Sequence, residues 1–136
     1  MDQEDRRRRR SIDPLIALHY QLAHIRTSGA LDAIVVADAS GVVVAGAGSW
    51  AACEELAAYA PLLARSGSGA HLDGDGDGES ASRVEALRAQ TAVTSFEVDD
   101  QEVLVCVRGG GNDGAERTTT VKAAAFGVAR ILRAAA

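Results

Sequence analysis

The sequence predicts a single α+β domain in which an antiparallel sheet of roughly five strands carries helices on both faces. Three observations lead to this prediction. Runs of β-branched residues alternate with segments whose apolar residues recur at helical spacing, two of the strand segments flank a tight turn, and 136 residues with 47% hydrophobic content suit one domain. The expected element order is α-β-β-α-β-β-β-α.

The first helix is expected to have Asp13 as its N-cap, to begin at Pro14 and to end at Gly29. Its main apolar stripe consists of Leu15, Leu18, Leu22 and Ile25. A second, weaker stripe, formed by Ile16, Tyr20 and Ala23, lies roughly 100° around the helix. The two stripes predict that this helix contacts two neighbours.

A β-hairpin follows the first helix and is the clearest local pattern in the chain. The two β-branched runs, residues 31–37 and 42–46, flank a four-residue turn that begins with Asp38 and ends with Gly41. Asp at the first position and Gly at the last are typical of such turns.

A middle helix is predicted from Trp50 to about Arg65, capped by Ser49, with Pro61 expected to kink or break it near Tyr59. Its sheet-facing side comprises Cys53, Leu56, Ala57, Ala60, Leu63 and Ala64. The helix has a second apolar side, and one sheet face can bury only one of them. We therefore predict a homodimer interface formed by Tyr59, Leu62, Glu55 and Ala58.

The second half of the chain is expected to contain residues 84–90, which fit a strand or a helix, then strands over 92–98 and 102–108 and a final helix starting near Thr118. The inward stripe of that helix is Val121, Ala124, Ala125, Val128 and Leu132. Phe126 lies on the opposite half, and two interpretations remain open. It packs against Ile16 and Tyr20, or it is an exposed partner-docking residue surrounded by Lys122, Arg130 and Arg133.

Charge and composition divide the chain into an Arg-rich tail over 1–12, expected to be disordered, and a domain over 13–134 that carries a flexible acidic, Gly-rich insertion at 66–80. The net charge is −5, and because the first ten residues contribute +2, the remainder carries −7. Such acidity argues against nucleic-acid binding. The sequence shows neither an apolar run long enough for a membrane span nor an apolar signal segment, so a cytoplasmic location is expected.

Candidate chemical sites are weak. The run from Asp73 to Gly78 resembles the start of a calcium loop, but Val84 stands where the loop needs a bidentate Glu. The glycine-rich segments lack the Gly-Lys-Ser/Thr of a phosphate loop. His19, His24 and His71 are too scattered for a triad or a metal site, and Cys106 reads as a core residue. Cys53 also reads as core, with a modest chance of a lowered pKa near its helix start. We expect no enzyme activity, no cofactor and no metal.

The segment 31–45, with its Asp38 to Gly41 turn, together with Glu54–Ala58 and Leu104–Val107, resembles the roadblock/dynein light-chain family of longin-like, profilin-like domains, in its bacterial form. The similarity spans about residues 14–134. It implies a noncatalytic homodimeric scaffold or regulator, with a small Ras-like GTPase as one candidate partner. The alternative is a small-molecule sensor module of GAF/PAS-like or profilin-like shape, which shares the opening hairpin.

Overall fold

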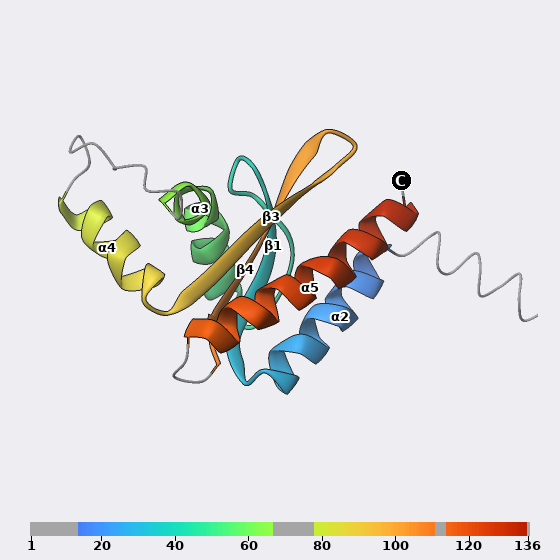
Figure 1. The fold of residues 1–136 in the computed structure, drawn as a ribbon, viewed down its shortest axis with the longest axis horizontal. Coiled ribbons are helices and arrows are strands. Elements are labelled where there is room, and N and C mark those ends of the chain that lie inside the picture. Colours follow the sequence, from blue (N-terminus) through green and yellow to red (C-terminus); the bar gives the residue numbers. More distant parts are fainter. Residues whose placement is uncertain (1–13, 67–77, 111–113, 136) are drawn as a thin grey trace, which may run out of the picture.

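The computed structural model describes residues 14–66, 78–110 and 114–135. These ranges contain four helices and four strands (Figure 1). The helices are α2 (Pro14–Ser28), α3 (Trp50–Ser66), α4 (Gly78–Arg88) and α5 (Gly114–Ala135). The strands are β1 (Leu31–Asp38), β2 (Val43–Ala47), β3 (Thr91–Val98) and β4 (Gln101–Gly109). The Arg-rich tail and most of the acidic insertion predicted from the sequence lie outside the described residues.

The four strands form one antiparallel sheet in the order β2-β1-β4-β3. β1 and β4 occupy its centre, with Val35 opposite Cys106. The predicted hairpin is confirmed, because β1 and β2 pair directly. In its turn the Asp38 carboxylate accepts hydrogen bonds from the backbone N–H groups of Ser40 and Val42, at 2.8 and 3.1 Å, and Gly41 has a φ of +85°. That positive φ explains why glycine ends the turn.

Each face of the sheet is covered by a separate apolar cluster. On one face α3 and α4 pack against side chains of β1 and β4; we call this the α3-side core, and its larger buried members are Val35, Leu56, Leu63, Val84, Leu87 and Leu104. On the other face lie α2 and α5, and this α5-side core includes Leu18, Leu22, Ile34, Val36, Val105, Val121 and Val128. Helices on both faces were expected from the sequence.

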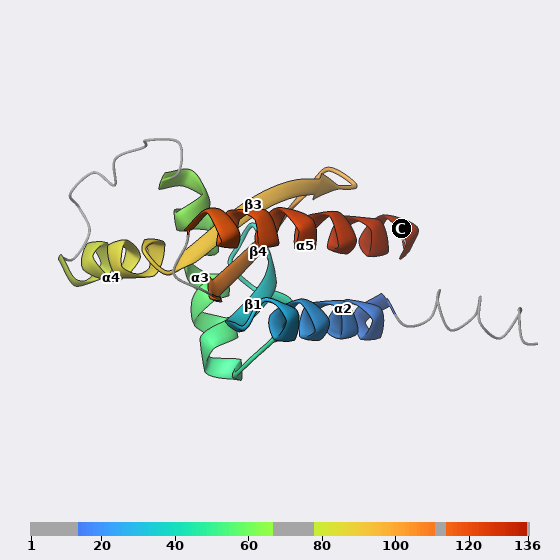
Figure 2. The ribbon, with the colours of Figure 1, turned by 60° about the horizontal axis from the view of Figure 1, so that its bottom comes forward.

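Helices α2 and α5 lie side by side, as Figures 1 and 2 both show. Gly127 of α5 lies at this contact: a Cβ there would lie 2.7 Å from Nε2, the end of the flexible Gln21 side chain on α2. On the opposite face, Ser49 caps α3 as predicted, since its hydroxyl oxygen accepts a hydrogen bond from the Ala52 N–H at 3.2 Å.

The main correction concerns the number of strands. The sheet has four strands, not five, because the ambiguous segment 84–90 contributes to helix α4 rather than to a strand. Val84 and Leu87, three residues apart, both turn into the α3-side core, and only helical spacing places them on one face. The order in the described residues is therefore α-β-β-α-α-β-β-α.

Four smaller predictions also differ from the structure. α3 continues through Pro61 without a break. α4 begins at Gly78, inside the segment expected to be a flexible insertion, and α5 begins at Gly114, four residues before Thr118. The second stripe of the first helix faces outward instead of contacting a neighbour: Ile16 and Tyr20 are both exposed.

Candidate interaction surfaces

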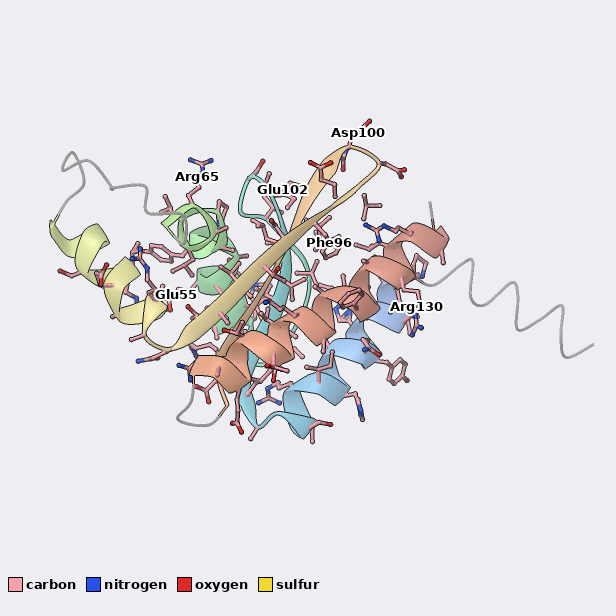
Figure 3. The ribbon with its side chains drawn as sticks, in the orientation of Figure 1. Glu55, Arg65, Phe96, Asp100, Glu102 and Arg130 are labelled. Carbon is pink, nitrogen blue, oxygen red and sulfur yellow. The ribbon has the colours of Figure 1, made fainter. Side chains whose placement is uncertain are left out.

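Three of the residues predicted at the dimer interface, Glu55, Tyr59 and Leu62, lie on the side of α3 that faces α4. The Glu55 carboxylate pairs with Arg83 of α4, and Figure 3 shows it on that side. Tyr59 and Leu62 are half-buried and pack against the α3-side core, which includes the buried residues of α4. The expectation that a monomer would leave these two side chains open to water is therefore only partly met.

Glu55 belongs to an ion-pair network that the sequence did not indicate. Oε1 of Glu55 lies 3.6 Å from Nη1 of Arg108, and Nε of Arg108 lies 3.9 Å from Oδ2 of Asp32. With Arg83, the network links α3, α4, β4 and β1. Partly exposed ion pairs of this kind contribute about 0–1 kcal/mol each, so the network orients α3 and α4 more than it stabilises the domain.

The outer ridge of α3 is open to solvent. Ala51, Glu54 and the predicted interface residue Ala58 are exposed there, and Trp50 at the start of the helix is 65% exposed. Ala51, Glu54 and Ala58 recur at spacings of three and four and so lie along one line of the helix surface, while Trp50 stands at the start of the helix, about 100° around it from Ala51. An exposed tryptophan beside small alanines is a surface on which a second helix can approach closely.

Phe126 is 81% exposed on α5, so the interpretation that packs it against Ile16 and Tyr20 is wrong. Those two side chains are themselves exposed on α2, because α2 contacts α5 along the Gly127 side of that helix. Together with Lys122 and Arg133, Phe126 lines an open groove between α5 and β3. Arg130 is exposed but is not among the residues that line it.

The β3 side of the groove consists of Thr94, Ser95 and Phe96. The Arg133 guanidinium lies 6.0 Å from the centroid of the Phe96 ring, a cation–π contact, and its Nη2 donates a 3.1 Å hydrogen bond to the Glu97 carbonyl oxygen. Figure 3 shows Phe96 between β3 and α5. This groove, defined by residues of α5 and β3, is called the α5–β3 groove below.

Both thiols are buried, and neither forms a disulfide. Burial raises the pKa of Cys106 to about 12, and burial raises the pKa of Cys53 as well, against the lowering influence of Arg26 and Arg108. The expectation of a lowered pKa at Cys53 is therefore wrong. His19 and His24 are exposed on α2, away from both thiols, and the described part of the chain holds no group of three His, Cys, Asp or Glu placed to bind a metal.

His71 and the calcium-loop-like run at 73–77 lie outside the described residues. Of the helices that the structure describes, none has the length and apolar character needed to cross a membrane.

A β-hairpin, two helices on one sheet face, a second hairpin and a pair of helices on the other face make up an α+β fold of the kind that the roadblock resemblance implied. Comparison with solved structures agrees. The chain is similar to MglB of Myxococcus xanthus, a bacterial roadblock protein, with a TM-score of 0.56, 14% identity, and coverage of 90% of this chain and 92% of that one.

It is also similar to a structure described as MglB with tetrameric arrangement, with a TM-score of 0.57, 19% identity, and coverage of 90% and 93%. No protein-family model matches the sequence, and no curated protein is significantly similar to it. At these identities the likeness establishes the fold, and the roadblock resemblance seen in the sequence is confirmed at that level.

Proposed function

We propose that this protein is a noncatalytic homodimeric scaffold or regulator that acts through protein contacts, with a small Ras-like GTPase as one candidate partner. The observation that carries this proposal is the outer ridge of α3, where Trp50 at the start of the helix and Ala51 and Ala58 along it are exposed. The similarity of the fold to MglB, of which one structure is described as having a tetrameric arrangement, supports assembly with further copies.

A twofold contact between two α3 helices would cover this ridge, and the half-buried Tyr59 and Leu62 would lie at the margin of the contact. Because such a contact is self-complementary, each substitution acts twice. The noncatalytic part of the proposal is supported by the positions of the described histidines and thiols, which are exposed on α2 and buried in the core respectively.

The sensor alternative requires space for a ligand between the sheet and its helices. That space is filled by the α3-side core and the α5-side core, whose aliphatic members are almost completely buried. In the part of the chain that the structure describes, the α5–β3 groove also lies between the sheet and a helix, but it is open to solvent rather than an enclosed ligand cavity, so the sensor interpretation has the weaker support.

The dimer is tested by light scattering of the purified chain and of Ala58→Glu. Ala58 is exposed on α3, so the new carboxylate leaves the fold intact but places two charges at the twofold contact. Ala17→Glu, at an exposed alanine on α2, is the matched control. We expect a dimer for the wild type and the control, and a folded monomer for Ala58→Glu. A wild-type monomer at micromolar concentration would refute the dimer.

The GTPase partnership is tested by adding the chain to a small Ras-like GTPase from the same organism and measuring GTP hydrolysis. We expect the hydrolysis rate of the GTPase to change and the chain alone to show none. Hydrolysis by the chain alone would contradict a noncatalytic role. A GTPase that neither binds the chain nor changes its rate would remove that candidate partner while leaving the dimer claim standing.

A further inference from the structure

Among the residues that the structure describes, no strand pairs with the outer edge of β3. This strand is last in the order β2-β1-β4-β3, and within the described residues it pairs only with β4. Because residues 84–88 belong to helix α4, they do not supply a covering strand. Figure 1 looks onto this edge, with α5 on one side of β3 and α3 and α4 on the other.

The turn between β3 and β4 determines which backbone groups point outward. Asp99 and Asp100 form a two-residue loop, and both have positive φ, 52° and 65°, as in a type I′ turn. The residues flanking such a loop, Val98 and Gln101, form a hydrogen-bonded pair. Counting back from Val98 in steps of two, every second residue of β3 directs its N–H and C=O toward β4.

The intervening residues Val93, Ser95 and Glu97 therefore direct their backbone groups away from the sheet. The hydrogen bond from Arg133 to the Glu97 carbonyl oxygen supports this assignment independently, because that oxygen is reached from outside the ladder. Arg133 thus occupies one end of the edge. Val93 and Ser95 are left to present both a donor and an acceptor to a further strand.

The α5–β3 groove runs beside this edge and is cationic. α5 carries four cations, Arg117, Lys122, Arg130 and Arg133, against the carboxylate of Glu116, and two of the four lie in the groove. Lys122 and Arg133 line the groove together with the exposed ring of Phe126. Two cations, which would attract an acidic segment, and an exposed aromatic ring therefore lie beside the outward backbone groups of β3.

We propose that an extended acidic segment of a partner protein adds to β3 as a further strand. One apolar side chain of the segment packs on Phe126, while carboxylates on the same face pair with Lys122 and Arg133. The inference rests on the proposed role in protein contacts but does not need the dimer. The other candidate occupant, a second copy joined edge to edge at β3, is a separate outcome of the test below.

The test is fluorescence anisotropy with the peptide fluorescein-Glu-Thr-Glu-Thr-Leu-Thr-Glu-Thr-Glu, whose alternation places Leu and all the carboxylates on one face of a strand. We expect binding that weakens as salt rises. Phe126→Ala and Lys122→Glu should each weaken it by at least about tenfold. Ser95→Pro should weaken it similarly, because it removes an outward N–H that the fold itself does not use.

Tyr20→Ala is the matched control, since Tyr20 is an exposed aromatic residue on α2 outside the groove. It should bind like the wild type, and the same peptide with Lys in place of Glu should not bind. Circular dichroism melts show whether each variant is folded.

The proposal is overturned if the acidic peptide does not bind or if folded Ser95→Pro binds it equally. Binding to vesicles of anionic phosphatidylserine that requires Phe126, in place of peptide binding, would assign the groove to a lipid surface instead. Self-association lost in Ser95→Pro would also overturn it, in favour of a second copy at the edge. The dimer assay with Ala58→Glu is independent of all these outcomes, so failure of one proposal is distinguishable from failure of the other.

Discussion

The contact between Gly46 of β2 and Cys53 of α3 allows a quantitative test of how the first hairpin packs against α3. A Cβ added at Gly46 would lie 2.9 Å from the Cys53 Sγ and 3.3 Å from the Ile34 carbonyl oxygen. The thiol has little freedom to move, since it is almost fully buried and lies 3.6 Å from the Ala47 carbonyl oxygen. Gly46→Ala should therefore overpack this position.

Overpacking of a well-packed core costs about 1–3 kcal/mol. Replacing glycine within a strand returns about 0.5–1 kcal/mol of backbone entropy. We expect Gly46→Ala to lower the free energy of unfolding by about 1–2 kcal/mol, the difference between these two effects. Cys53→Ala alone should cost about 1–2 kcal/mol, because it leaves a small cavity under α3.

In the double variant the new methyl group at 46 enters the space that the sulfur vacates. The two effects should then be non-additive, with a coupling free energy of about 1–2 kcal/mol in favour of the double variant. Urea unfolding followed by far-ultraviolet circular dichroism measures all four proteins, at one protein concentration because assembly shifts apparent stability. Additive effects, or a neutral Gly46→Ala, would show that the hairpin and α3 do not pack as described.

Three further outcomes are expected. Val35→Asp places a charge at a fully buried position of β1 and should cost several kcal/mol, so cooperative unfolding should be lost. A soluble variant that still unfolds cooperatively would contradict the central place of this strand. Asp100→Gly should stabilise the domain by about 1 kcal/mol in urea unfolding, because Asp100 has a φ of +65°, and an unchanged or lower midpoint would argue against strain there. Burial raises the pKa of Cys106 from 9.0 to about 12, so the contribution of the neutral thiol to stability is complete below pH 9 and is lost as the pH rises toward 12. The loss amounts to at most about 1.4 kcal/mol per pH unit. Cys106→Val should remove this part of the pH dependence of the free energy of unfolding, and an unchanged pH profile would refute the assignment.

Short-range patterns in the sequence were sufficient to predict the first hairpin, the cap at Ser49 and the buried stripes of α3 and α5. Each of these depends on residues within a few positions of one another. The turn at Asp38 closes through its own side chain, and the Leu56 and Val128 stripes follow the helical period. The roadblock-type fold followed from the order of such elements, and the structural comparison confirms it.

The segment containing Val84 and Leu87 was undecided in the sequence because so short and charged a stretch, with only two large apolar residues, does not define a period. Its helical state is tied to tertiary contacts, since both side chains become buried in the α3-side core, and the ion pair between Arg83 and Glu55 lies beside them. The same contacts leave β3 as the sheet edge.

Phe126, Ile16 and Tyr20 illustrate the same limit at the surface. Helical periodicity placed Phe126 off the inward stripe, and it is exposed. Helical periodicity could not show that α2 packs along the Gly127 side of α5 and leaves all three side chains exposed. Periodicity defines which face of a helix is apolar, whereas only packing defines which neighbour covers that face. The α5–β3 groove therefore exists only in the folded chain.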